Sequence, residues 1–212
     1  MKILKPQNID DLDNEYLKNI SDGEKAVYCN FENENSDGTD LFETEFENCR
    51  FRNVMMQNVM LEKVGFKNVC FEKCNFSNAE FSETSFIRCE FKNCKLSGCS
   101  MVDCRLFNVL FSQTNAGYFN ISMGSIENVL FKDTVLKNAY FLETKMKKVY
   151  FDSADLTQSK FLKTSLNGVD LSNSEIEGIA VGADDIKGAV IEPSQAVDLL
   201  YLIGVKLKTN NF

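Results

Sequence analysis

Four cysteines stand five residues apart in the stretch CEFKNCKLSGCSMVDC, which runs from Cys89 to Cys104. Cysteine sulfur can ligate zinc, form disulfides or pack as a small apolar group, so the spacing allows three interpretations. A structural zinc site usually has Cys-x-x-Cys pairs or histidine partners. The stretch has no such pair and the chain has no His. The choice therefore depends on how the surrounding residues fold.

The apolar residues repeat with a period of five. From Leu41 to Ile191, every fifth residue is large and apolar except Ala116, and 13 of the 18 Phe fall in this series. The residue two places before each large one is Ala, Cys, Gly, Ser, Thr or Val, apart from Phe119, Ile179 and Asp184. Neither the helical period of 3.6 nor the strand period of 2 gives this pattern. A short extended piece followed by a sharp turn does.

The polar positions agree with such a turn. Asn is frequent two residues after the large residue, as at Asn53, Asn58 and Asn68. Asn tolerates left-handed backbone geometry and can bond its own backbone, which suits a corner. We therefore predict stacked coils in which each unit contacts its neighbours along a rod. Phe119 is expected to refill the volume left by the small residues Ala116 and Gly124.

The repeat resembles that of the pentapeptide-repeat family, whose units read roughly A(D/N)LXX. "ADLTQ" at 154–158 is a copy, and "CNFSN" at 74–78 and "CEFKN" at 89–93 are close variants. The resemblance covers about 160 residues and implies an all-β fold, a right-handed, four-sided parallel β-helix with 20 residues per coil. Eight coils at the usual strand spacing would span roughly 35–40 Å.

This architecture favours a packing role for the cysteines. Seven of the eight occupy the small interior position, and Cys70 alone points outward. Cys89, Cys94, Cys99 and Cys104 would lie on four different sides, so they could not converge on one metal ion. Cys29 and Cys49, and Cys74 and Cys94, are 20 residues apart and would stack within disulfide range. The chain lacks a secretory signal and a long apolar run, which predicts a cytoplasmic location where thiols stay reduced.

Both ends of the rod need caps, because a β-helix leaves open sheet edges there. Ile9, Leu12, Tyr16 and Ile20 share one helical face, with Asn8 as the N-cap, which predicts a helical N-terminal cap within residues 1–27. The repeat domain is predicted over 28–192. Its start, 31–41, has Glu34 and Ser36 at interior positions, which predicts a loop or ragged first coil.

Residues 193–212 are predicted to form a C-terminal helix and tail, with Ser194 as the N-cap. The helix is apolar nearly all round, although a cap needs only one apolar face. A second apolar face predicts a homodimer. A helix folded into a groove of its own coil is the alternative. The candidate dimerisation residues are Val197, Leu199, Leu200, Leu202 and Ile203.

The charge argues for a protein partner rather than nucleic acid. The net charge is −8, and binding phosphates needs a basic stripe. When the sequence is folded onto four sides, the third and fourth sides of the last coils carry acids and no Lys or Arg. This candidate acidic patch contains Asp152, Asp155, Asp170, Glu175, Glu177 and Glu192. An ordinary solvated surface is the alternative interpretation.

The C-terminal stretch "GADDIKGAVIEPSQAVDLLYLIGVKL" at 182–207 resembles the Qnr and MfpA branch of the family. The resemblance implies a dimeric, non-enzymatic DNA mimic that binds DNA gyrase and topoisomerase IV and protects them from fluoroquinolones. The acidic patch would then dock on the DNA-binding saddle. A scaffolding rod with another protein partner is the alternative. An enzyme is disfavoured, because the chain lacks His, a Gly-rich phosphate loop and a nucleophile motif, and no cofactor is expected.

Overall fold

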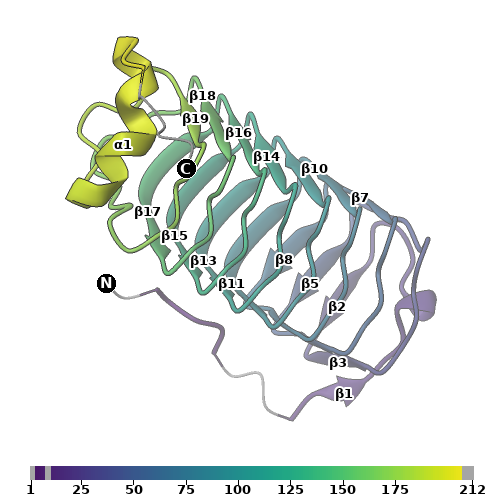
Figure 1. Cartoon of the computed structure of the whole chain (residues 1–212). Helices are drawn as coiled ribbons and strands as arrows, with labels where there is room; N and C mark the ends of the chain where they lie inside the picture. Colours follow the sequence, from purple (N-terminus) through teal and green to yellow (C-terminus); the bar gives the residue numbers. More distant parts are fainter. Residues whose placement is uncertain (1–2, 8–10, 207–212) are drawn as a thin grey trace, which may run out of the picture.

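The chain forms a β-solenoid of about eight turns with one short C-terminal helix, as the computed structural model shows (Figure 1). The structure describes residues 3–7 and 11–206. Strands pair in parallel with partners 20 residues away, for example Phe86 with Leu106. A left-handed corner comes every fifth residue, so each turn has four sides, as predicted.

Two sheets form three of these sides. The 11-stranded sheet covers the second and third sides with β1 (Asp13–Asn14), β2 (Lys25–Val27), β3 (Cys29–Glu32), β5 (Glu45–Glu47), β6 (Arg50–Arg52), β8 (Gly65–Lys67), β9 (Cys70–Glu72), β11 (Ser85–Lys92), β13 (Arg105–Ser112), β15 (Ser125–Lys132) and β17 (Lys145–Asp152).

The eight-stranded sheet forms the first side with β4 (Leu41–Phe42), β7 (Met60–Glu62), β10 (Glu80–Ser82), β12 (Ser100–Val102), β14 (Asn120–Ser122), β16 (Tyr140–Leu142), β18 (Lys160–Leu162) and β19 (Ala180–Val181). The fourth side has single bridges instead of strands, among them Asn35 with Met55 and Asp155 with Glu175.

The core is the predicted series of large residues stacked coil on coil. Phe91, Phe111, Phe131 and Phe151 form a continuous stack with ring centroids 4.8, 4.8 and 5.3 Å apart and planes within 9° of parallel. Offset stacking of this kind adds to the burial of apolar area. Phe119 lies fully buried at its small position, as predicted.

The corners have the left-handed geometry that the frequent Asn residues predicted. Asn53 and Asn68 have φ of 52° and 60°, but Lys63 and Glu83 adopt the same conformation, with φ of 55° and 50°. The coil therefore imposes the corner on residues that do not prefer it, and Asn lowers the cost where it occurs.

The predicted N-terminal helix is wrong over the residues that the structure describes. Asp13 and Asn14 form β1, which pairs in parallel with β3. Among the described residues before the repeat, the only helical turn is the 3₁₀ turn η1 (Leu17–Asn19). Asn8 and Ile9 lie outside the described residues. The open edge of the first coil offers backbone partners to this segment, and pairing with that edge outweighs the helical periodicity.

The segment 31–41 belongs to the first coil, so of the two predicted alternatives the loop is wrong, while Glu34 stands half-buried at an interior position as in a ragged coil. Ser36 is buried, and Phe31 and Leu41 belong to the core. The coil starts before the predicted boundary at residue 28, since β2 already pairs with β5. Ser36 stands at a large position of this coil, and Leu17, fully buried, packs with the core residues of the first coil.

The C-terminal helical segment consists of three short helical pieces in succession. It consists of η2 (Pro193–Gln195), α1 (Ala196–Leu199) and η3 (Leu200–Ile203), and it closes with Gly204 in the left-handed region at φ 73°. The N-cap is Glu192 rather than the predicted Ser194. Glu192 and Gln195 form a reciprocal capping box, and Pro193 supplies the fixed φ of the first helical position.

Candidate protein-binding surfaces

The cysteines lie in the core and do not form a site. Six are buried, Cys29 and Cys70 are half-buried, and all eight are free thiols. Burial raises the pKa of Cys49, Cys89 and Cys104 to about 12, so these thiols are protonated and unreactive near neutral pH. Among the described residues, no group of His, Cys, Asp or Glu is arranged to hold a metal ion.

The C-terminal helical segment lies across the end of the rod with two distinct faces (Figure 1). Its inner face packs Leu199 and Leu202 against the core. Its outer face exposes Val197 and Ile203, at 53% and 74%. Leu200 lies between them and is half-buried. The candidate dimerisation residues thus divide into cap residues and an exposed apolar face.

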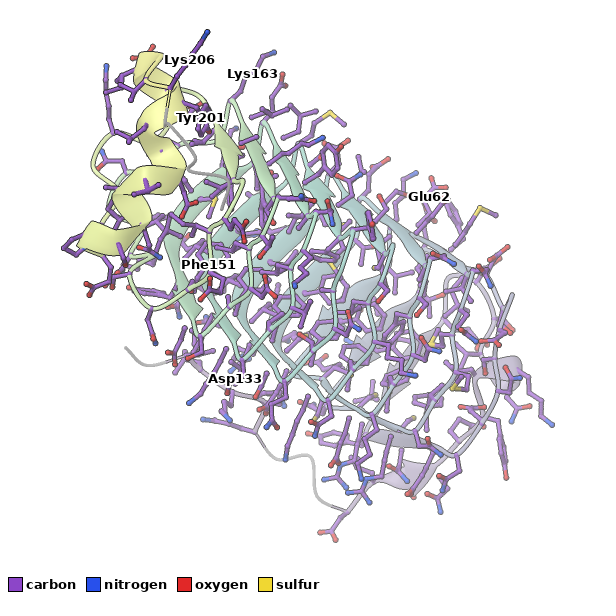
Figure 2. All side chains as sticks on the ribbon, viewed as in Figure 1. Glu62, Asp133, Phe151, Lys163, Tyr201 and Lys206 are labelled. Carbon is purple, nitrogen blue, oxygen red and sulfur yellow. The ribbon has the colours of Figure 1, made fainter. Side chains whose placement is uncertain are left out.

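Two polar side chains that the sequence did not single out hold this segment in place. The Tyr201 hydroxyl accepts from the Val181 N–H at 3.1 Å and donates to the Ile179 carbonyl at 2.9 Å. Gln195 Nε2 donates to the carbonyls of Leu171 and Ser174 at 2.9 and 2.6 Å. Figure 2 shows Tyr201 on the segment beside the end of the rod. Both residues satisfy backbone groups at the sheet edge that a cap must cover.

A groove of about 640 Å³ lies between the fourth side of the last coils and this segment. Asp155 and Glu175 reach it from stacked positions on the rod, and Glu192 and Asp198 reach it from the helical segment. Asp198 was missed by the sequence analysis. The signal was its i, i+4 spacing from Ser194, which lines the same groove.

The structure brings together three of the six predicted acidic residues. Asp155, Glu175 and Glu192 line the groove, whereas Glu177 does not. Asp152 and Asp170 do not line it either, although Ser172 and Asn173 next to Asp170 do. The name acidic groove is used below for the site formed by Asp155, Glu175, Glu192 and Asp198.

Hydrogen bonds lower the pKa of two carboxyl groups at this end, those of Asp155 and Asp170. Partial burial opposes ionisation of Asp155, but hydrogen bonds from Thr157 and Lys137 outweigh it and hold its pKa below the usual value. The Ser172 hydroxyl and N–H lower the pKa of Asp170 in the same way. Lys137 is 3.1 Å from Asp155, and no described lysine or arginine forms an ion pair with Glu175, Glu192 or Asp198.

The acids of the first coils are instead neutralised by ladders of basic residues. Glu47 accepts from Lys25 and Lys67 at 2.8 and 2.6 Å, which lowers its pKa to about 2. Arg52 lies between Glu32 and Glu72 at 3.6 and 3.2 Å. Although residues 1–48 hold 13 of the 31 acids, part of their charge is thus compensated on the surface.

Family models of pentapeptide repeats match the chain along most of the repeat. Residues 64–141 match the family model of the pentapeptide repeat region, and residues 39–78 and 134–173 match that of pentapeptide repeats in eight copies. No curated protein sequence matches the chain. No helix among residues 3–7 and 11–206 is long and apolar enough to cross a membrane.

Several solved structures resemble this one at low sequence identity. HetL, a protein involved in heterocyst differentiation regulation from the cyanobacterium Nostoc sp. strain PCC 7120, is 13% identical, with 80% of this chain and 90% of HetL covered and a TM-score of 0.43. Full-length QnrB1, a plasmid-mediated fluoroquinolone resistance protein, is 18% identical, with 85% and 100% covered and a TM-score of 0.41. A thylakoid lumen protein of Arabidopsis thaliana is 18% identical, with 50% and 63% covered and a TM-score of 0.22. At these identities the similarity concerns the fold alone.

Proposed function

Because the chain belongs to the pentapeptide-repeat family, whose repeat specifies a shape rather than a reaction, we propose that it is a non-enzymatic, cytoplasmic binding protein. Its partner is a DNA-binding protein, which the rod engages in place of duplex DNA. The partner class is a type II topoisomerase, DNA gyrase or topoisomerase IV. Occupying the DNA-binding saddle would inhibit the enzyme, protect it from fluoroquinolones, or both.

The acidic groove is the observation that carries this proposal. Four carboxylates from two parts of the chain surround one groove, and among the described lysines and arginines only Lys137 forms an ion pair with one of them, Asp155. A cluster of uncompensated anions attracts a surface that is built to bind phosphates, and it accelerates the encounter through long-range steering. The resemblance of residues 182–207 to the Qnr and MfpA branch supports the choice of topoisomerases.

A homodimer through the C-terminal helical segment would extend this surface. Val197 and Ile203 are exposed on the face that points away from the core, and exposed apolar residues of this kind favour an interface. A two-fold axis at this face would bring two acidic grooves near the centre of a doubled rod, since Glu192 and Asp198 lie on the same segment.

A charge reversal tests the proposal. We expect Asp155→Lys, Glu175→Lys and Asp198→Lys together to abolish the effect of the purified protein on DNA gyrase, because they replace attraction to a basic saddle by repulsion. The measurement is DNA supercoiling by gyrase, with and without ciprofloxacin. The matched control reverses Glu80, Glu83 and Asp103, which lie outside the groove and make no ion pair with described residues, and it should behave as wild type.

A folded triple variant that still acts on gyrase like the wild type would contradict the role of the groove. No effect of the wild-type protein at micromolar concentration would contradict the topoisomerase proposal itself. The second candidate is a scaffolding rod for a different protein. The neutralised ladders around Glu47 and Arg52 favour it, because they make the first coils less like a polyanion than the net charge suggests.

A further inference from the structure

The solenoid is open at one corner between β17 and the following coil. β11, β13 and β15 each pair with the next strand over the second and third sides, but β17 ends the sheet. Among the described residues, no backbone hydrogen bond joins 145–151 to 165–171. The first side stays closed through β16 and β18, and the fourth through the Leu156 N–H, which donates to Glu175 O at 2.8 Å.

Two side chains of the following coil bond to their own segment where the ladder is missing. The Asn167 N–H donates to Ser165 Oγ at 3.3 Å, and the Ser172 N–H donates to Asp170 Oδ1 at 3.0 Å. Such bonds from a side chain to its own segment compete with a sheet ladder. Gly168 has the left-handed φ of 77° at the corner, as Lys148 has with 53° in the coil before, so both coils turn there without a ladder between them.

The opening leaves backbone groups of β17 without partners. At the equivalent corner of earlier coils, the Asn48 and Asn68 N–H groups donate to Lys67 O and Ile87 O at 3.0 and 2.8 Å. The Lys148 N–H has no such bond to a described residue. An unpaired strand edge is a template for another extended chain.

The cleft beside this edge is lined in part by an apolar core residue. A cleft of about 290 Å³ lies between residues 146–150 of β17 and residues 167–169. Met146 lines it and is only half-buried, although it occupies a large interior position, and every other such position from Leu41 to Val181 is buried. Met is a flexible, polarizable side chain that adapts to a partner.

The rim of the cleft is basic. Lys147 and Lys148 line it, and Lys145 precedes them on the same strand. Lys145 and Lys148 make no ion pair with a described residue. Lys147 pairs with Glu127 at 2.7 Å. Arg105 and Lys145 line an adjoining hollow of about 410 Å³ that shares Met146 and Lys147 with the cleft. The charge here is opposite to that of the acidic groove on the fourth side.

We propose that this cleft binds an acidic, extended peptide segment of another protein by β-strand addition. The peptide backbone pairs with the open edge of β17, its carboxylates contact Lys145 and Lys148, and an apolar side chain covers Met146. Main-chain hydrogen bonds give affinity in this binding mode, and the side chains select the sequence. The site is independent of the acidic groove, so the rod can hold two partners.

A labelled peptide tests this proposal. The probe is a fluorescein-labelled heptapeptide of alternating Glu and Val, and the readout is fluorescence anisotropy with the full-length protein. We expect saturable binding that Lys145→Glu with Lys148→Glu weakens at least tenfold, through lost attraction and new repulsion. The matched control, Lys73→Glu with Lys95→Glu, makes the same charge change at exposed positions away from the cleft and should bind like wild type.

A second peptide separates strand addition from charge attraction alone. Methylation of alternate backbone nitrogens removes its donors without changing its charge, so we expect it to lose binding. Protection of the Lys148 amide from hydrogen exchange on binding the unmodified peptide would support the same conclusion. Absence of binding by the unmodified peptide, equal binding by the methylated one, or equal loss in both lysine variants would overturn the proposal.

Discussion

At the scale of single residues, Gly124 shows how closely the coils pack. A Cβ at this interior position would lie 2.5 Å from the carbonyl oxygen of Cys104 in the coil below, closer than real Cβ atoms approach. We expect Gly124→Ala to lower the free energy of unfolding by about 1–3 kcal/mol, because the backbone must shift to admit the methyl group. Chemical denaturation followed by circular dichroism measures this difference.

The matched control for this residue is Gly65→Ala. A Cβ at Gly65 would meet Glu45 Cγ at 3.5 Å, an ordinary contact, so the unfolding free energy should stay within about 1 kcal/mol of wild type. Equal effects of the two substitutions would contradict the role of close approach. The sequence predicted a small residue at position 124 from the period alone. It could not predict that only Gly fits, since this depends on the local spacing of two backbones.

At the scale of elements, Leu17 takes the place of the predicted N-terminal helix. Its side chain is fully buried over the first coil, and Glu34 accepts a hydrogen bond from its N–H at 3.2 Å. We expect Leu17→Ala to destabilise the protein by about 2–5 kcal/mol, because it uncovers the end of the aromatic core. The melting temperature by differential scanning calorimetry measures the loss. Tyr16→Ala, at a side chain 55% exposed, should leave it nearly unchanged, and the reverse order would contradict this account.

The repeat was predictable from the sequence, whereas the exceptions to it were not. The large series from Leu41 onward depends on the period of five, so its burial follows from local sequence, and the resemblance to pentapeptide-repeat units implied the four-sided coil. The N-terminal cap depends instead on which free strand edge the segment 11–20 can reach, and in the structure β1 pairs with β3. The opening beside β17 is a local departure from the ladder in the following coil, and the phase of the repeat continues through it unchanged.

For the acidic groove, the sequence predicted part of the site. Asp155 and Glu175 are 20 residues apart, so their stacking follows from the coil length. Asp198 joins them only because Gln195 and Tyr201 hold the helical segment against the rod, and the repeat carries no signal for those contacts.

At the scale of the whole molecule, charge and exposed apolar area divide the rod into different surfaces. The acidic groove lies beside the C-terminal segment, the basic cleft lies at the corner of the second and third sides, and the first coils carry compensated ladders. The acidic groove and the basic cleft share no lining residue, although both lie on the last coils. The length of the assembly then depends on whether two rods join at their C-terminal ends.

The last prediction concerns this association. We expect the wild-type protein to have twice the 24.1 kDa mass of the chain in analytical ultracentrifugation, and Val197→Asp with Ile203→Asp to have the mass of one chain. Each Asp would place a desolvated charge in the apolar contact of the dimer. In the monomer both positions face water, so the rod of the variant should still unfold cooperatively, as a folded protein does. Met60→Asp with Tyr118→Asp, at side chains 57% and 66% exposed elsewhere on the rod, is the matched control and should remain dimeric. A wild-type protein that stays monomeric at high concentration, or a control that dissociates as well, would contradict an interface on the outer face of the C-terminal segment.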